Sequence, residues 1–432
     1  MSRVLVLGAR VSGLAAARLA RSRGMSVTMY AEDDAPQALS EGFAFASGGW
    51  DPVLLTGIDV VVASPGFSER SLPIVEAMEW GIPVWSEIEF AWRHLTKPVA
   101  AVTGTNGKTT VSEAASAMLA ASGVTAPAAG NIGLPLSDFV DEPSDSLIVE
   151  VSSFQLRFIE TFHPVAAALT NVAVDHLDWH GSEISYRSAK AKIFSNQDEG
   201  DLLVYDADDT GAASLVTGAM SELFPVSGSR LPAGGGGVEN GHLIVGEVEV
   251  EVGELTSADP IHLVNLATAS ALALRMGGTP TGVTDAARDF SPGAHRRTVV
   301  AVRDDVRWVD DSKATNPHAA IASIRSHDSV ILIAGGLAKG LDLRPLAEEP
   351  NLRAVIGIGA EGPVLVEAAG SRGHLAGTLD QAVELAAGLA EPGDTVLLAP
   401  GCASFDQFKS YGERGDQFAS LVKARTEGGS EA

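Results

Sequence analysis

Short apolar runs that end in glycine-rich or polar turns recur along the chain, and helical patterns separate them. In the first segment the runs Val4–Leu7, Ser26–Tyr30 and Asp59–Ala63 predict strands, and Leu14–Arg23 predicts a helix after the first of them. Strands that alternate with helices are typical of a parallel sheet that binds ligands at the carboxyl ends of its strands. Residues 1–94 therefore predict a Rossmann-like domain.

The same alternation recurs over residues 95–288 and again over residues 289–432. We expect helices over Ser182–Phe194 and Leu263–Met276, and a flexible loop over Pro232–Gly237, where four glycines follow one another. The pattern thus predicts an α/β protein of three domains, each built on a mostly parallel sheet, with a second Rossmann-like domain at the C-terminus. The further strands expected in these two segments are Val99–Val102, Leu147–Val149, Ala166–Leu169, Val306–Val309, Val330–Ile333, Val355–Ile358 and Thr395–Leu398.

Charge narrows the partners that such a chain can bind. Its 432 residues carry a net charge of −25, with an isoelectric point of about 4.7, so we expect it to bind neither nucleic acid nor an anionic membrane. No run of about 18 apolar residues is present, so we expect no membrane insertion. The single cysteine, Cys402, allows no internal disulfide and favours the cytoplasm. The polar tail Thr426–Ala432 predicts disorder.

The strongest chemical motif follows the first strand of the middle segment. The run Gly104-Thr105-Asn106-Gly107-Lys108-Thr109-Thr110 lies between an apolar strand and a helical pattern, which is the context of a phosphate loop. Backbone N–H groups and a helix N-terminus favour phosphate there, Lys108 adds a charge, and the Thr109 hydroxyl can ligate Mg²⁺. Val102 stands where the strict pattern has a glycine. We interpret residues 95–288 as a phosphate-loop, ATPase-like domain.

A second glycine-rich turn, Gly8–Gly13, lies near the N-terminus. It is similar to a dinucleotide fingerprint, but Arg10 replaces the middle glycine that would let the backbone approach a pyrophosphate. Glu32 follows the next strand, at the place of a ribose-binding acid. A nucleotide could therefore bind at this turn, whereas dehydrogenase chemistry is disfavoured.

Polar groups also follow other predicted strand ends. Glu150 ends a buried strand, where phosphate-loop enzymes need an acid for Mg²⁺, and His176 follows the next strand. Lys190, read on its own, is an ordinary solvated lysine of a helix. The last segment adds cations and hydroxyls where an anionic substrate could bind: Arg296, Asp311–Asn316, Lys339 and Cys402–Phe408.

With these residues in view, the chain resembles the Mur ligases, a family of peptidoglycan amide ligases, and within them the members that add D-glutamate. The resemblance covers the three-segment plan from end to end. It is carried by Thr103–Thr110, Gly130–Gly133, Glu150–Leu156, Asp175-His176, Tyr186–Lys190, His295-Arg296, Asp311–Asn316 and Cys402–Phe408.

The resemblance implies an ATP-dependent reaction of peptidoglycan precursor synthesis. ATP would phosphorylate the terminal carboxylate of UDP-N-acetylmuramoyl-L-alanine, and the amine of D-glutamate would attack the acyl phosphate to form an amide. Two anions meet in such a step, so Lys108 and two Mg²⁺ ions would screen them. We expect a cytoplasmic monomer with these three partners.

The resemblance also implies a role for individual residues. Lys108, Glu150, His176 and Lys190 would be catalytic. Thr109 would hold one Mg²⁺, and Glu150 and His176 would hold the second, joined by Lys190 if CO₂ carbamylates it. Thr268 stands where the family often has a second asparagine after Asn265, which leaves the adenine contact open. ATP would contact Gly104, Thr105, Asn106, Gly107, Lys108, Thr109, Thr110, Asn265, Arg296 and Asp311. The UDP-muramoyl substrate would contact Ser12, Glu32, Gly66, Asn131, Ser152, Gln155 and His176. D-glutamate would contact Lys313, Thr315, Lys339, Ser404 and Tyr411.

Three alternatives stay open at this point. A sister ligase could add L-alanine or a diamino acid, although the Asp-Asn-Pro-Arg run of the diamino-acid ligases is missing from the sequence. A folylpolyglutamate-type ligase shares the phosphate loop, and the uridine-type first segment argues against it. A nucleotide-binding module or dehydrogenase would bind NAD without ATP turnover, which the grouping of Glu150, His176 and Lys190 disfavours.

Overall fold

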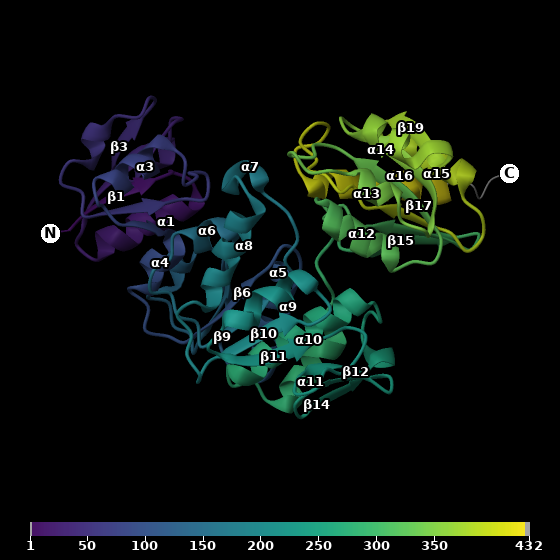
Figure 1. Ribbon diagram of the computed structural model, residues 1–432, viewed down its shortest axis with the longest axis horizontal. Helices are drawn as coiled ribbons and strands as arrows, with labels where there is room; N and C mark the ends of the chain where they lie inside the picture. The colour runs from purple at the N-terminus through teal and green to yellow at the C-terminus, as the bar shows by residue number, and fades with distance from the viewer. Residues whose placement is uncertain (1, 428–432) are drawn as a thin grey trace. The chain divides into compact units, whose positions relative to one another are not determined.

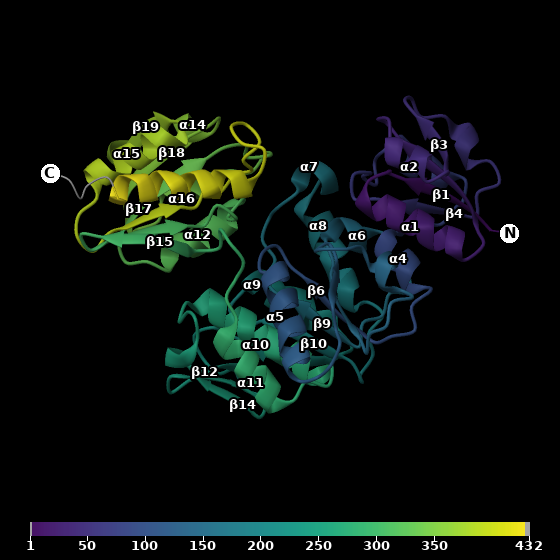
Figure 2. The ribbon, with the colours of Figure 1, turned by 180° about the vertical axis from the view of Figure 1, so that it is seen from behind.

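The computed structural model describes residues 2–427 and contains three β-sheets flanked by helices (Figures 1 and 2). The chain forms two compact units. The first comprises the residues up to Ala173 together with Trp179–Phe290, and the second comprises Val174–Asp178 together with the residues from Ser291 onward. The predicted α/β class with mostly parallel sheets is confirmed. Within residues 2–427, no helix combines the length and the hydropathy that a membrane crossing requires.

The first sheet has five parallel strands in the order β3-β2-β1-β4-β5. The strand order reverses between β1 and β4, and such a switch point is where ligands bind in open α/β sheets. Its strands are β1 (Arg3–Leu7), β2 (Ser26–Ala31), β3 (Ala44–Ser47), β4 (Val60–Ala63) and β5 (Val84–Ser86). Its helices are α1 (Val11–Ser22), α2 (Pro36–Ser40), α3 (Leu72–Glu79) and α4 (Glu87–Trp92), with the 3₁₀ turn η1 (Pro52–Leu55).

The middle sheet has nine strands in the order β14-β13-β12-β11-β10-β9-β6-β8-β7. The strands from β7 to β12 in this order are parallel, and β12, β13 and β14 form antiparallel hairpins. The strands are β6 (Val99–Thr103), β7 (Ala128–Gly130), β8 (Leu147–Glu150), β9 (Ala166–Leu169), β10 (Leu202–Asp206), β11 (Glu222–Val226), β12 (Gly236–Glu239), β13 (His242–Val245) and β14 (Val248–Glu251).

Helices α5, α10 and α11 pack together on one face of this sheet (Figure 2), where they share a buried core with residues of β6, β8 and β9. The helices of this part are α5 (Lys108–Ala121), α6 (Ser153–Arg157), α7 (Leu177–His180), α8 (Glu183–Ala191), α9 (Thr210–Leu215), α10 (Pro260–Arg275) and α11 (Pro280–Asp289). The 3₁₀ turns are η2 (Leu136–Phe139), η3 (Lys192–Phe194), η4 (Val216–Gly218) and η5 (Val252–Glu254).

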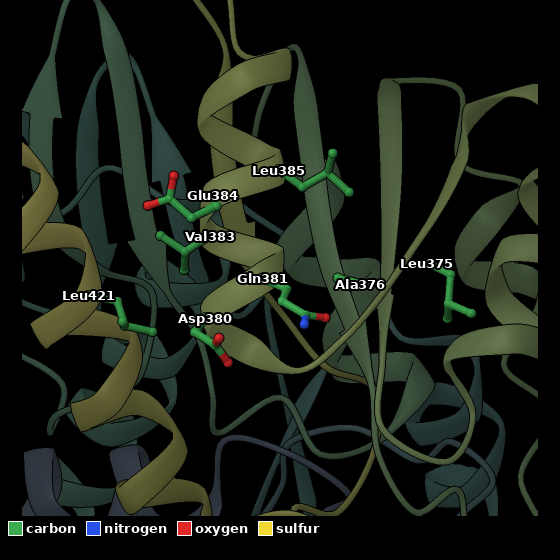
Figure 3. Close-up of a pocket in the computed structure, with 8 residues that line it drawn as sticks. All are labelled: Leu375, Ala376, Asp380, Gln381, Val383, Glu384, Leu385 and Leu421. Atoms are coloured by element: carbon green, nitrogen blue, oxygen red, sulfur yellow. The ribbon is translucent and has the colours of Figure 1, made fainter.

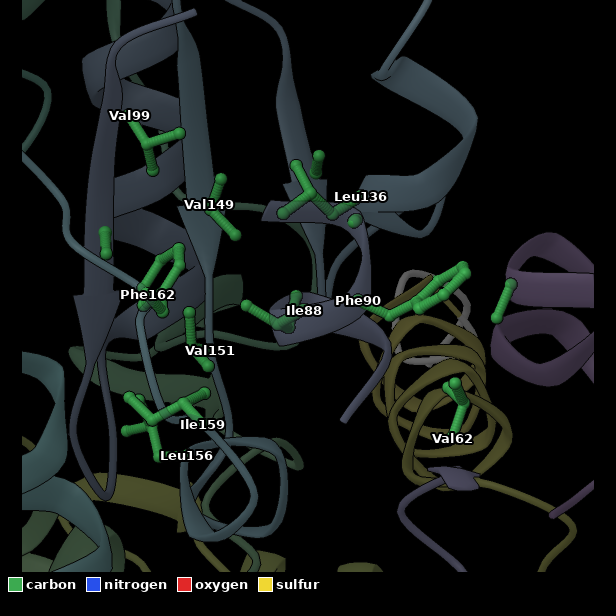
Figure 4. Close-up of a cluster of buried hydrophobic side chains, with 14 of the residues drawn as sticks. Val62, Ile88, Phe90, Val99, Leu136, Val149, Val151, Leu156, Ile159 and Phe162 are labelled. Carbon is green, nitrogen blue, oxygen red and sulfur yellow. The ribbon is translucent and has the colours of Figure 1, made fainter. Parts of the chain in front are cut away.

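One buried core joins the first and middle sheets. Val62 of β4 and Val149 of β8 belong to the same cluster, in which Ile88 and Phe90 of α4 lie between them (Figure 4). Apolar burial of this kind contributes roughly 25 cal/mol per Å². The first two sheets therefore belong to one compact unit, and the domain boundary expected after residue 94 stays a prediction.

The second unit has a six-stranded sheet in the order β15-β16-β20-β17-β18-β19, in which only β15 is antiparallel to its neighbour among the described residues. Successive residues of β17 point to opposite faces, so Leu332 packs against α12–α14 and Ile333 against α15 and α16. The elements are β15 (Thr298–Arg303), β16 (Val306–Asp310), β17 (Val330–Gly335), β18 (Leu352–Ile358), β19 (Gly373–Gly377), β20 (Thr395–Leu398), α12 (Pro317–Arg325), α13 (Arg344–Ala347), α14 (Gly362–Ala369), η6 (Gly370–Arg372), α15 (Leu379–Leu389) and α16 (Tyr411–Glu427).

Some local predictions were wrong. The loop expected over Pro232–Gly237 ends early, because Gly236 and Gly237 form the start of β12 and pair with β13. A Cβ at Gly237 would lie 2.0 Å from the Arg230 carbonyl oxygen, so the glycine is required by packing rather than by flexibility. The helix expected over Ser182–Phe194 ends at Ala191 and continues as η3. The backbone of Thr426 and Glu427 is helical, against the predicted disorder, and the rest of that tail lies outside the described residues.

Candidate active site

The phosphate loop lies between β6 and α5, as the sequence predicts. Gly104 and Gly107 have φ angles of +154° and +82°, which side-chain-bearing residues rarely adopt. A Cβ at Gly104 would also lie 1.8 Å from the Thr170 hydroxyl oxygen. The loop backbone is thus shaped by contacts that only glycine permits.

Residues after the neighbouring strand β9 hold the loop in place. The Asn106 amide N–H donates to the Asn171 side-chain oxygen at 2.8 Å, and the Thr170 hydroxyl donates to the Asn106 carbonyl at 2.5 Å. The Thr105 amide donates to the Asn171 carbonyl at 2.8 Å. No role was predicted for Thr170 and Asn171; their position at the end of the strand beside β6 is the signal that could have indicated one.

Two lysines converge on the same carbonyl group. Lys108 Nζ donates to the carbonyl oxygens of Gly104 and Thr105 at 2.9 and 3.0 Å, and Lys190 Nζ donates to that of Gly104 at 2.6 Å. Lys190 is fully buried, with its ammonium 4.7 Å from the ring centre of Tyr186. The reading of Lys190 as a solvated lysine, drawn from its helix alone, was wrong, because that face of α8 packs against the loop.

Glu150 offers a free oxygen at the end of β8. One carboxylate oxygen accepts a hydrogen bond from the Asn131 side-chain amide at 2.8 Å. The other, Oε2, is buried and has no hydrogen-bond partner within the described residues. Since β8 pairs with β6 in a register that sets Glu150 opposite Val102, this oxygen lies at the same sheet edge as the phosphate loop. A buried carboxylate oxygen at this sheet edge fits a hard divalent cation such as Mg²⁺.

Ser152 and Gln155 are buried beside Glu150 and already bonded to each other. The Ser152 hydroxyl and backbone N–H both donate to the Gln155 side-chain oxygen at 2.9 Å, and the Gln155 amide N–H donates to the Ser152 hydroxyl. This reciprocal pair is a capping box that starts α6. Their expected contact with the muramoyl group stays a prediction.

Asn265 lies against the phosphate loop from α10. A Cβ at Gly107 would meet the Asn265 side-chain oxygen at 2.8 Å. The Thr268 hydroxyl instead donates to the Val264 carbonyl of its own helix at 2.7 Å. Asn265 thus lies at the phosphate loop, whereas the Thr268 hydroxyl is bonded within its own helix.

The expected uridine residues gather at the switch point of the first sheet. Ser12 lies in the first turn of α1, while Glu32 and Gly66 are exposed and follow β2 and β4, the two neighbours of β1. Arg10, the N-cap residue of α1, makes no side-chain cap hydrogen bond, and the first turn of the helix contains no acid. N–H groups at such a helix start favour an anion.

In the second unit, buried Arg414 joins two of the predicted loops. Its guanidinium donates to the hydroxyl and carbonyl oxygens of Ser312 at 2.9 Å and to the Cys402 carbonyl at 3.2 Å. Burial lowers the pKa of Arg414 to about 10, so it stays charged at neutral pH. Burial also raises the pKa of the Cys402 thiol to about 12, which leaves it protonated. Arg414 was not singled out from the sequence, because its partners lie far away along the chain.

The predicted D-glutamate residues come from these joined loops. Lys313 Nζ lies 3.9 Å from the ring centre of Tyr411, and Lys339 Nζ lies 5.9 Å from that of Phe405. Ser404 is buried, and the bridge between Leu337 and Ala403 brings the Lys339 loop beside it. Thr315 is half-buried in the loop that follows β16. Two cations and several hydroxyls therefore share one end of this sheet, which suits an anionic ligand.

The predicted nucleotide contacts Arg296 and Asp311 lie in the same unit. Asp311 is buried, and desolvation raises the pKa of its carboxyl although the nearby Arg297 guanidinium opposes the shift. Next to half-buried Arg296, His295 Nδ1 lies 2.7 Å from an oxygen of Asp310. Their contact with ATP stays a prediction.

His176 belongs to the second unit with its neighbours Val174–Asp178. It has a φ of +51°, and its backbone N–H donates to the Asp175 side chain at 2.8 Å. The other oxygen of Asp175 accepts from the Asn316 side-chain amide at 3.2 Å. The structure thus explains the fixed backbone at His176, while its partnership with Glu150 stays a prediction.

Comparisons with known proteins agree with this geometry. Residues 102–224 match the Mur ligase middle domain, and residues 295–402 match the Mur ligase glutamate ligase domain. The UDP-N-acetylmuramoylalanine–D-glutamate ligase of Frankia casuarinae is 43% identical over 445 residues, which cover 98% of this chain and 94% of that protein. The chain belongs to the Mur ligase family.

Other Mur ligases extend the likeness. The enzyme of the same name from Mycobacterium tuberculosis is 36% identical over 98% of this chain and 95% of its own. Among solved structures, a pseudomurein peptide ligase from Methanothermus fervidus has a TM-score of 0.63 and 18% identity, covering 98% of this chain and all of that one. The UDP-N-acetylmuramate-alanine ligase of Thermotoga maritima has a TM-score of 0.56 and 17% identity, again covering 98% of this chain and 100% of its own. These structures share the fold.

A surface hollow of this Mur ligase lies apart from the predicted site residues. It has a volume of about 570 Å³ and opens beside α15, between the edge strand β19 and α16 (Figure 3). None of its lining residues was expected to bind a substrate. They are Leu375, Ala376, Asp380, Gln381, Val383, Glu384, Leu385 and Leu421.

Proposed function

We propose that this Mur ligase adds D-glutamate to UDP-N-acetylmuramoyl-L-alanine in an ATP-dependent, ADP-forming reaction of peptidoglycan precursor synthesis. The observation that carries the proposal is the convergence of Lys108 and Lys190 on Gly104, at the sheet edge where Glu150 keeps a buried oxygen free. Full-length similarity to proteins named for this reaction supports the choice of substrates.

The chemistry needs activation because a carboxylate is a poor electrophile. Transfer of the γ-phosphoryl group of ATP to the alanine carboxylate forms an acyl phosphate and ADP. The D-glutamate amine attacks this carbonyl, the carbon–oxygen bond to phosphate breaks, and the amine loses a proton as the amide and free phosphate form. Lys108 and the loop N–H groups hold the phosphates in place and screen the approach of one anion to another.

The donor set fits divalent cations. Thr109 would hold one Mg²⁺ and Glu150 a second, and the two ions would neutralise charge on the transferring phosphoryl group. We further propose that His176 joins the second ion and that Lys190 is carbamylated, since reaction of its amine with CO₂ would release a proton and give an anion beside the loop. The burial of Lys190 against Gly104 supports this role, because a carbamate there would be shielded from water.

D-glutamate carries two carboxylates and needs several donors. We assign them to Lys313, Lys339, Thr315, Ser404 and Tyr411 at one end of the second unit's sheet, which the Arg414 bonds hold together. The cytoplasmic location and monomeric state are part of the same proposal; the buried, protonated Cys402 is consistent with a reducing compartment.

The test is phosphate release with UDP-N-acetylmuramoyl-L-alanine, ATP and Mg²⁺, with D-glutamate, L-glutamate, L-alanine and a diamino acid offered in parallel. We expect turnover with D-glutamate alone. Turnover with another amino acid would assign the chain to a sister ligase. A bifunctional folylpolyglutamate synthase/dihydrofolate synthase shares the fold at a TM-score of 0.54, so turnover only with a folate and glutamate would replace the proposal.

A further inference from the structure

A tryptophan links the first sheet to the phosphate loop. Trp179 of α7 is half-buried, and its ring packs against the core cluster on one face of the first sheet. Its indole N–H donates to the Pro65 carbonyl at 3.1 Å, and the Arg70 guanidinium donates to the Trp179 carbonyl at 3.1 Å. The loop that follows β4 and carries Gly66 is thus fixed to Trp179 from two sides.

Aromatic contacts connect Trp179 to the phosphate loop. Its ring centre lies 4.5 Å from that of His180, which in turn lies 5.3 Å from that of Tyr186. The Tyr186 hydroxyl is hydrogen-bonded to the Thr105 hydroxyl at 2.9 Å. A continuous series of packed side chains therefore runs from the Gly66 loop to the phosphate loop.

The proposed substrate must span the same interval. Its uridine end is assigned to the Gly66 edge, and its alanine carboxylate must reach the γ-phosphate held at Thr105–Lys108. Phosphoryl transfer requires the reacting atoms to be about 3–3.5 Å apart, and a 1 Å error can cost about 100-fold in rate. The spacing between the two binding loops is therefore a catalytic variable.

We propose that Trp179 is a positioning residue that sets this spacing, so that a substrate bound by its nucleotide end presents its carboxylate to the phosphate loop. The inference rests on the proposed function. It predicts different effects on turnover of the whole substrate and on binding of UDP alone. Loss of the indole N–H should impair the use of the whole substrate more than the binding of its nucleotide fragment, because UDP occupies only one end of the span.

The main experiment compares Trp179→Phe with Trp80→Phe in the full chain. Phenylalanine keeps a ring against His180 and removes the bond to Pro65. Trp80 is 54% exposed at the end of α3, so the same exchange there serves as a matched control. We expect Trp179→Phe to lower kcat/KM for UDP-N-acetylmuramoyl-L-alanine about 10-fold, with the UDP dissociation constant and the KM for ATP within about twofold of the wild type, and Trp80→Phe to change none of them.

An equal loss of UDP affinity and kcat/KM in Trp179→Phe would overturn the proposal, since Trp179 would then only support the Gly66 loop. Unchanged kcat/KM would overturn it as well. If Trp179→Phe unfolds at assay temperature, Arg70→Ala replaces it in the experiment. The exposed Arg70 side chain donates to the Trp179 carbonyl. We expect Arg70→Ala to lower kcat/KM less than Trp179→Phe, again with little change in the UDP dissociation constant. Wild-type enzyme without D-glutamate turnover would instead contradict the proposed function.

Discussion

Two glycine-rich turns in the first unit follow the same plan and are built differently. Both follow an interior strand of their sheet and both start a helix. At the first turn, α1 begins from Arg10 with no side-chain cap, and Ser12 lies half-buried beside it. At the phosphate loop, side chains from α8, from α10 and from the segment after β9 lie against the backbone or side chains of the turn.

The difference fits the function that we propose for each turn. A turn that only holds a nucleotide can leave its N–H groups open to solvent until the ligand arrives. A turn that takes part in phosphoryl transfer gains from donors fixed in advance, because they need not reorganise as charge develops. The bracing by Thr170, Asn171 and Tyr186 distinguishes the two turns more clearly than their glycine patterns do.

The largest expected effect is the loss of the loop lysine. Lys108→Ala removes the fixed charge beside the phosphates, so we expect kcat/KM for ATP to fall on the order of 10³-fold. Arg10→Ala, the corresponding cation of the first turn, is exposed and should cost less than about threefold. Steady-state phosphate release measures both, and equal losses would contradict the distinction between the turns.

Lys190→Ala should remove most of the activity, on the order of 10²-fold, because a buried group at Gly104 is lost. We expect partial rescue by a small carboxylic acid such as acetate, which would restore an anion in the space of the carbamate. Lys108→Ala is the control, since acetate should not restore a missing cation. A Lys190→Ala variant with wild-type activity would remove this lysine from the site.

A substitution at Glu87 tests the contact between the part of the first unit built on the first sheet and the part built on the middle sheet, which carry the two turns. Glu87 is fully buried at the start of α4, where one carboxylate oxygen accepts from the Ser137 N–H of η2 at 2.6 Å and desolvation raises the pKa of the carboxyl to about 7. Because the folded pKa exceeds the ordinary value, the stability it contributes is full below about pH 4.5 and is lost as pH rises toward about 7.

Glu87→Gln should therefore be more stable than the wild type above pH 7, by on the order of 3 kcal/mol, and similar to it near pH 4.5. Denaturant unfolding at several pH values checks this difference. Partly buried Asp138, whose carboxyl pKa burial also raises, offers the control Asp138→Asn with a smaller effect. If the free energy of unfolding of Glu87→Gln differs from that of the wild type by the same amount at every pH, packing and not titration of Glu87 causes the difference.

The smallest effect compares one hydroxyl from each turn. Thr105→Val removes the hydrogen bonds of this hydroxyl to Tyr186 and to the Ala173 backbone, and should raise the KM for ATP about 10-fold, since the loop loses its bracing there. Ser12→Ala should raise the KM for the UDP substrate about threefold and leave that for ATP unchanged. A reversed pattern of KM changes would exchange the roles assigned to the two turns.

Much of the architecture follows from local pattern. The strands Val99–Val102 and Thr395–Leu398 were predicted nearly to the residue, because a buried parallel strand is a continuous apolar run with a glycine or polar residue at its end. The hairpin over β12–β14 was missed, since the glycines of Pro232–Gly237 indicate a turn equally well. Packing against Arg230 decides that Gly237 is a strand residue.

The sequence by itself determined the class of fold and the place of the phosphate loop, because both depend on residues that are close together along the chain. Only the tertiary structure decided that Lys190 is buried against Gly104, that Glu150 keeps one oxygen without a partner among the described residues, and that Trp179 contacts Pro65. These contacts join residues far apart in the chain. They depend on the order of the strands and on which helix face turns inward, and no local pattern specifies either.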